Sequence, residues 1–113
     1  MKNLNVLIEI KNMFGATEIQ VDGENKIMWV NGKTIKTDVN KFLSRLFNIT
    51  ASWEGEYYRD MLDAEEFSLY ISDGKKTQNV HCRGRYPINY GSLKDLIAEV
   101  RNGRNWGWWN KFI

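Results

Sequence analysis

A chain of 113 residues, of which 42% are hydrophobic and 13% aromatic, has enough apolar surface to bury a core, and this composition excludes an intrinsically disordered protein. Its 16 basic and 14 acidic residues leave a formal charge of +2, which is too small for the long-range field of a generally basic nucleic-acid-binding protein. Cys82 is the only cysteine and His81 the only histidine, which excludes an intramolecular disulfide and the common structural zinc sites and favours the reducing cytoplasm.

The first third of the chain has the alternating pattern of a half-buried sheet. Apolar residues alternate with polar ones over two stretches, with Leu7 as the apolar exception on the outer face: Leu4, Val6, Ile8 and Ile10, then Ile19 and Val21. The dipeptides Asp22-Gly23 and Asn31-Gly32 accept positive φ, so they predict tight turns on either side of a strand over residues 27–30. A return strand over residues 33–37 completes the predicted meander.

A helix is predicted after this meander, because Asp38 is a suitable N-cap and is followed by apolar residues at helical spacing. This apolar stripe consists of Val39, Phe42, Leu43, Leu46 and Phe47. The stripe predicts that the helix covers one face of the sheet.

The segment over residues 52–66 is strongly acidic and predicts a connecting strand and turn. A second hairpin follows, with Phe67, Leu69 and Ile71 on its first strand, Asp73-Gly74 at its turn, and Val80 and Cys82 on its second strand. Pro87 cannot donate to a sheet ladder, so this strand should end near Tyr86. The sequence from Ser92 to Asp95 has the form of a capping box, and it predicts a second helix that carries Leu93, Leu96, Ile97 and Val100 and ends at Gly103.

The two hairpin-helix segments are similar in sequence pattern. Apolar positions of the first helix recur 51 residues later in the second, and Asp22-Gly23 recurs at the same distance as Asp73-Gly74. We therefore expect one α+β domain over residues 1–113, with an antiparallel meander and hairpin sheet and two amphipathic helices packed on one face. Its first half would cover about residues 1–50, its second about 56–103, and an aromatic tail 104–113. The pattern leaves open whether the halves are a true duplication.

None of the familiar catalytic or metal-binding motifs is recognisable in the sequence. His81 and Cys82 are adjacent on a predicted strand, where successive side chains point to opposite faces, so they are not expected to form a nucleophile-base pair. The acidic segment lacks the spacing of a calcium loop, and there is no phosphate-binding glycine loop. Charged Glu9 and Lys11 interrupt the N-terminal apolar stretch, and no run reaches the roughly 18 apolar residues of a membrane helix. We expect no cofactor, no metal and no membrane insertion.

The C-terminal tail is the least ordinary segment of the chain. Aromatic and basic side chains interleave there in the manner of protein-interface anchors or of platforms that stack single-stranded bases: Arg101, Arg104, Trp106, Trp108, Trp109 and Phe112. The same aromatic residues could instead fold back and cover the core. A basic group on the second hairpin offers a candidate nucleic-acid contact: Lys75, Lys76, Arg83 and Arg85.

These patterns favour a non-enzymatic protein–protein interaction module, with another protein as the expected partner and a second copy of the chain as one candidate. The alternative is a module that binds single-stranded nucleic acid locally, through the basic hairpin and the tryptophan-rich tail. A second alternative is an enzyme without a recognisable motif. The stretch RGRYPINYGSLKDLI, residues 83–97, resembles small bacterial proteins with a strand, a proline turn and a helix, and this resemblance implies no activity.

Overall fold

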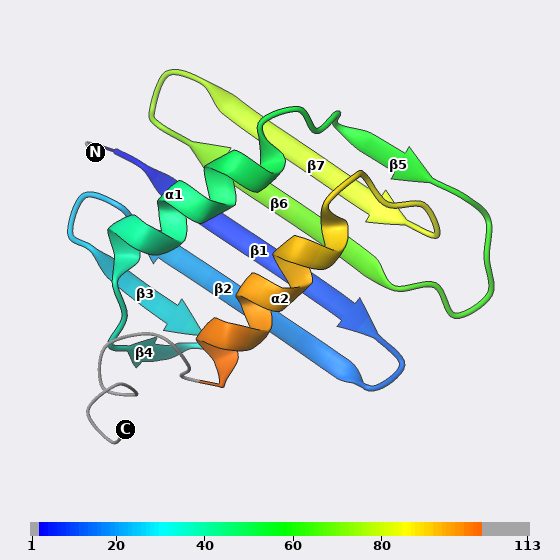
Figure 1. Ribbon diagram of the computed structural model, residues 1–113, viewed down its shortest axis with the longest axis horizontal. Coiled ribbons are helices and arrows are strands. Elements are labelled where there is room, and N and C mark those ends of the chain that lie inside the picture. Colours follow the sequence, from blue (N-terminus) through cyan, green and yellow to red (C-terminus); the bar gives the residue numbers. More distant parts are fainter. Residues whose placement is uncertain (1–2, 103–113) are drawn as a thin grey trace.

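Seven strands form one sheet in the order β4-β3-β2-β1-β6-β7-β5, and two helices cover one of its faces (Figure 1). The structure is a computed structural model that describes residues 3–102. The elements, in chain order, are β1 (Asn5–Asn12), β2 (Gly15–Asp22), β3 (Ile27–Val30), β4 (Lys33–Ile35), α1 (Val39–Thr50), β5 (Glu56–Tyr58), β6 (Glu66–Ser72), β7 (Thr77–Arg83) and α2 (Tyr90–Arg101). The predicted α+β class, with two helices on one face of the sheet, is confirmed.

The alternation of apolar and polar residues decides which face of each strand meets the helices. Val6 and Ile8 of β1 are buried against the helices, as are Ile19 and Val21 of β2, whereas Leu7 lies on the outer face as predicted. The same alternation buries Phe67 on β6. The core therefore lies between the sheet and the two helices.

Helix α1 begins where its sequence predicts. The Asp38 carboxylate accepts a hydrogen bond from the backbone N–H of Lys41 at 3.0 Å, which satisfies one of the free donors of the first turn. The apolar stripe is buried from Val39 to Leu46, and Phe47 is half-buried at its edge. An ion pair between Arg45 and Glu99 links α1 to α2.

Helix α2 begins earlier than predicted, and the expected capping box is wrong. The chain turns after Pro87, where the Tyr90 N–H donates to the Pro87 carbonyl at 3.2 Å. Asn89 occupies the N-cap position with φ of 68°, and its side chain makes no capping hydrogen bond. Ser92 and Asp95 therefore lie inside the helix. The helix ends at Arg101, and Gly103, where its end was predicted, lies outside the described residues.

Strand β7 also ends earlier than predicted, at Arg83 rather than near Tyr86. Gly84 follows it with φ of +76°, a conformation that favours glycine. A Cβ atom at Gly84 would lie 2.1 Å from the carbonyl oxygen of Arg59, so the close approach of residue 59 also requires glycine. This approach ends the strand and starts the turn toward Pro87.

The acidic segment contributes β5, which forms one edge of the sheet and pairs with β7 in parallel. The predicted connecting strand is therefore present, but the sheet is mixed rather than wholly antiparallel. Tyr57 of β5 points toward the core and is buried, and the guanidinium of Arg85 lies 5.6 Å from the centre of its ring. These contacts hold the short strand at the edge of the sheet.

The two hairpin-helix segments are alike locally but differ in topology. Helix α2 begins and ends 51 residues after α1, and Asp22 and Asp73 each accept two backbone N–H bonds in their turns. Strands β2 and β6 both run antiparallel to β1 and lie on either side of it, so β3 and β7 lie on opposite outer sides. Because both helices cover the same face, one hairpin is arranged as the mirror image of the other. No rotation superposes the two halves.

Candidate functional site

Exposed apolar side chains gather at one end of the sheet, where β1, β5 and β7 end and β2 and β6 begin (right-hand side of Figure 1). Seven large apolar residues are exposed in the described part of the chain, and all except Tyr70 lie in the connections and strand ends of this region. We call this group the apolar end: Met13, Phe14, Tyr58, Met61, Leu62 and Ile88. Phe14 and Leu62 are 91% and 92% exposed, so neither side chain contributes to the core.

The backbone that carries the apolar end is anchored by hydrogen bonds. The side-chain oxygen of Asn12 accepts from the Phe14 N–H at 2.9 Å and fixes the turn between β1 and β2. The Arg59 N–H donates to the Arg83 carbonyl at 2.9 Å and ties the loop after β5 to the end of β7. The exposed side chains are therefore presented from positions that the fold determines.

Glu65 anchors the far end of the same loop through three hydrogen bonds to its carboxylate and one to its backbone carbonyl. Its carboxylate accepts from the Tyr90 hydroxyl at 2.6 Å, from the Asn12 amide at 3.1 Å and from Lys94 Nζ at 3.2 Å. Its backbone carbonyl accepts from the Tyr86 hydroxyl at 2.6 Å. The rings of Tyr86 and Tyr90 stack with their centres 4.6 Å apart. Glu65 thus joins β1, α2 and the turn that follows β7.

The Glu65 network shifts two pKa values away from neutrality. Burial raises the pKa of the Glu65 carboxyl, but the hydrogen bonds from Tyr90, Asn12 and Lys94 outweigh burial and lower the pKa below its usual value. Burial, followed by the hydrogen bond to Glu65, raises the pKa of the Tyr90 hydroxyl far above its usual value. An efficient general acid or base titrates close to the working pH. The network is therefore suited to holding structure at neutral pH rather than to moving protons.

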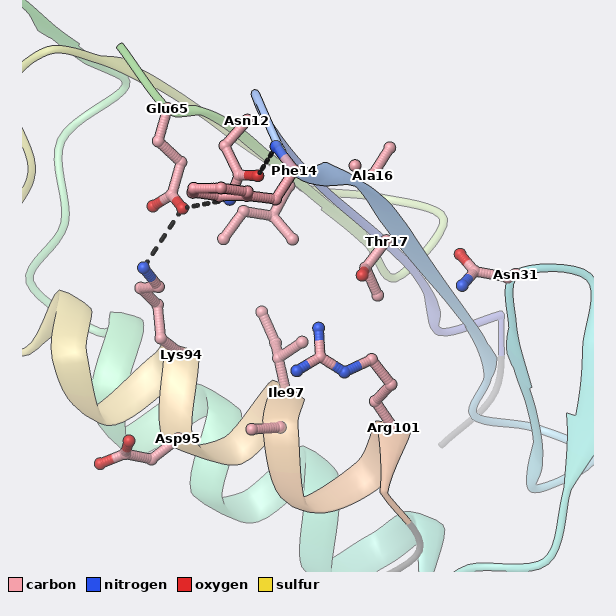
Figure 2. Close-up of a pocket in the computed structure, with 13 residues that line it drawn as sticks. Asn12, Phe14, Ala16, Thr17, Asn31, Glu65, Lys94, Asp95, Ile97 and Arg101 are labelled. Atoms are coloured by element: carbon pink, nitrogen blue, oxygen red, sulfur yellow. Dashed lines mark hydrogen bonds and ion pairs between the residues drawn. The ribbon is translucent and has the colours of Figure 1, made fainter. Parts of the chain in front are cut away.

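A groove of about 580 Å³ lies between α2 and the hairpin of β1 and β2. Figure 2 shows Glu65 and Lys94 at one end of this groove and Arg101 at the other, with its guanidinium turned inward. Phe14 lies over the groove beside Glu65, and Ile97 lies between Lys94 and Arg101 (Figure 2). The groove is consequently apolar in its middle and charged at both ends.

The tail residues predicted to bind a partner fall almost entirely outside the described part of the chain. Of that group the structure describes only Arg101, at the end of α2. The others lie outside residues 3–102: Arg104, Trp106, Trp108, Trp109 and Phe112.

The residues of the predicted basic hairpin do not come together. Lys75 and Lys76 lie in the turn between β6 and β7, whereas Arg83 and Arg85 lie at the other end of β7. A strand of seven residues is about 20 Å long, so these two pairs lie on opposite ends of the sheet. They do not form a single basic patch.

His81 and Cys82 lie on opposite faces of β7, as predicted. The His81 Nε2 atom lies 3.0 Å from a Glu66 carboxylate oxygen, and its Nδ1 atom lies 3.4 Å from one of Glu56, on the outer face. Cys82 faces the helices, and burial, with a smaller contribution from the charge of Glu56, raises the pKa of its thiol to about 11. The thiol is therefore protonated and enclosed at neutral pH.

The outer face of the sheet is not covered by any described helix. One row of side chains across it is rich in carboxylates: Glu18, Glu9, Ser68, His81 and Glu56. Glu9 and Glu18 lie directly opposite each other in the antiparallel register, and neither makes an ion pair with a described residue. Two like charges in this position repel each other.

Sequence reasoning missed the apolar end, although two signals for it were present. Met13 and Phe14 are apolar residues in the turn between two strands, a position where polar residues are usual. Met61 and Leu62 are apolar residues within the acidic segment. Both pairs could have been identified as apolar residues with no predicted core to enter.

Comparison with known proteins adds no relative, because no family model, curated protein or solved structure matches the chain. No helix within residues 3–102 is long and apolar enough to cross a membrane. Over the same residues, no group of three or more histidine, cysteine or acidic side chains is placed to hold a metal ion.

Proposed function

We propose that this protein is a non-enzymatic protein–protein interaction module that binds its partner through the apolar end. The observation that carries the proposal is the concentration of six of the seven exposed large apolar side chains of the described region at one end of the sheet. Scattered surface apolar residues are ordinary, whereas a contiguous group is typical of a binding surface.

The anchoring of the apolar end supports this function. Binding is weakened when flexible loops must become ordered, and the bonds at Asn12, Arg59 and Glu65 restrict these loops before any partner arrives. Exposed Asp60 and Asp63 lie in the same loop as Leu62 and provide a charged border. Protein interfaces commonly combine an apolar centre with such a polar border. A cytoplasmic location is part of the proposal, and the single buried thiol of Cys82 is compatible with it.

The proposal is tested by affinity capture with the full chain and two variants. The double variant Met13→Ser/Leu62→Ser removes two exposed side chains of the apolar end, and Tyr70→Ser is the matched control because Tyr70 is the exposed aromatic residue elsewhere on the sheet. We expect a protein in native lysate to bind the wild type and the control but not the double variant. All three should unfold at similar urea concentrations, since surface substitutions usually change stability by about 0.5 kcal/mol or less.

Two further arms of the experiment separate the alternatives. Nuclease treatment of the lysate should leave the captured protein in place, and its loss would favour the nucleic-acid alternative. Sedimentation of the purified chain identifies a second copy as the partner if the wild type and the control associate and the double variant does not. Capture that is the same for the wild type and the double variant would contradict the proposal.

A further inference from the structure

The unsatisfied polar groups of the groove beside α2 are hydrogen-bond donors. Arg101 makes no hydrogen bond or ion pair with any residue in the range 3–102, and its guanidinium points into the groove (Figure 2). Asn31 accepts from the Glu18 N–H at 2.8 Å with its side-chain oxygen, which leaves its amide nitrogen as a donor. Thr17 is 8% exposed, and its hydroxyl makes no hydrogen bond with a described residue.

Among the charged residues that line the groove, Arg101 carries the positive charge that is available to a ligand. Glu65 and Lys94 form an ion pair at the far end of the groove, so their charges largely cancel there. Asp95 also lines the groove, but its carboxylate is turned away from Lys94 and Arg101 in Figure 2. The carboxyl end of a helix carries a partial negative charge, and it would repel an anion if Arg101 did not compensate for it.

The spacing along α2 explains how one helix supplies both the polar and the apolar wall. Lys94, Ile97 and Arg101 are separated by three and four residues, so they lie on one face of the helix. Phe14 faces them from across the groove (Figure 2), and Ile10 of β1 also lines it. A ligand bound here would place an apolar body between Ile97 and Phe14 and a negatively charged group beside Arg101.

We infer that this groove is a binding site for an organic anion in which a carboxylate is attached to an aromatic or aliphatic group. A carboxylate accepts two hydrogen bonds from a guanidinium in a planar arrangement, and the Thr17 hydroxyl and the Asn31 amide provide further donors. A groove of about 580 Å³ is within the usual size of small-molecule sites. The same chemistry is found in a free small carboxylate and in the carboxyl end of a peptide with an apolar last residue.

The inference is tested by a heteronuclear NMR titration of the full chain with phenylbutyrate and with its neutral amide. Phenylbutyrate should produce saturable shifts at the backbone amides of Thr17, Ala98 and Arg101. The neutral amide should bind at least about 10-fold more weakly, because it lacks the charge that strengthens the hydrogen bonds. The peptide acetyl-Gly-Gly-Phe and its carboxyl-terminal amide form a second pair of ligands. This pair shows whether the peptide or the free carboxylate is the better source.

Variants show whether the binding depends on the named side chains. Arg101→Ala should weaken phenylbutyrate binding about 10-fold or more, since it removes the charge-assisted bonds. Thr17→Val should also weaken it while keeping the shape of the side chain. Lys75→Ala is the matched control, because it removes one positive charge at the opposite end of the sheet and should leave binding unchanged.

The inference is overturned if the carboxylate and the amide bind equally, or if Arg101→Ala binds like the wild type. It is also overturned if the full chain gives no saturable shift at the groove with any of the four ligands. These outcomes do not depend on the partner-binding proposal, because Met13 and Leu62 do not line the groove.

Discussion

The Glu65 side chain joins segments around the candidate site that are far apart in the sequence. Replacing it with alanine leaves the hydroxyl of the buried Tyr90 without its acceptor and releases Asn12 and Lys94. We expect Glu65→Ala to lower the free energy of unfolding by about 1–3 kcal/mol, the usual cost of leaving a buried polar group unsatisfied. Urea denaturation measures this change, and an unchanged midpoint would contradict the structural role.

The same residue predicts a dependence of stability on pH. Because the pKa of Glu65 is lower in the folded protein than its usual value of 4.5, its carboxylate stabilises the fold at pH values above 4.5. This stabilisation is lost as the pH falls through the folded pKa. The difference in unfolding free energy between the wild type and Glu65→Gln should therefore be largest at about pH 7 and shrink toward about pH 3. A difference that stays constant across this range would exclude the carboxylate as its source.

At the scale of elements, the outer face of β1 and β2 contains an unfavourable pair that can be relieved. Glu9 and Glu18 face each other across the two strands. Glu9→Gln removes the repulsion and should raise the free energy of unfolding by about 0.2–1 kcal/mol. Glu24→Gln in the following turn is the matched control, with the same loss of charge and no opposing carboxylate in the ladder. Urea denaturation of both variants checks the difference, and equal effects would show that only net charge matters.

Patterns within one element were predictable from the sequence, and pairings between elements were not. The alternation in β1 predicts its buried face, and Asp38 predicts the start of α1, because both depend on neighbouring residues. The parallel pairing of β5 with β7 depends on residues more than twenty positions apart, which periodicity does not report. The start of α2 was mispredicted since the turn after Pro87, rather than a side-chain cap, decides it.

The residue types of the candidate site were likewise visible in the sequence, whereas their arrangement in space was not. Arg101 was predicted to bind a partner because it belongs to a segment in which aromatic and basic residues interleave. Its place in the groove, however, depends on the hairpin of β1 and β2 packing beside α2. The apolar end brings together loops that are far apart in the sequence, such as those of Phe14 and Leu62, which are 48 residues apart. Only the sheet order makes them neighbours in space.

At the scale of the whole molecule, Phe14 belongs both to the apolar end and to the wall of the groove. We therefore expect Phe14→Ser to weaken both partner capture and phenylbutyrate binding. Met13→Ser/Leu62→Ser should weaken only the first, and Arg101→Ala only the second. Capture and NMR titration measured on the same preparations check this division. If Phe14→Ser left both kinds of binding intact, the two surfaces would not share this residue.

The central place of β1 in the sheet affects how the chain can assemble. β1 is synthesised before β6, yet β6 is one of its two neighbours, and Asn5 pairs with Ser72. On the ribosome, β1 and β2 can pair early, but the second edge of β1 stays open until residue 72 has emerged. During that interval Leu7 and the unpaired backbone of β1 are available to other chains. The carboxylates of Glu9 and Glu18, which oppose each other in the finished sheet, would then help to keep nascent chains apart.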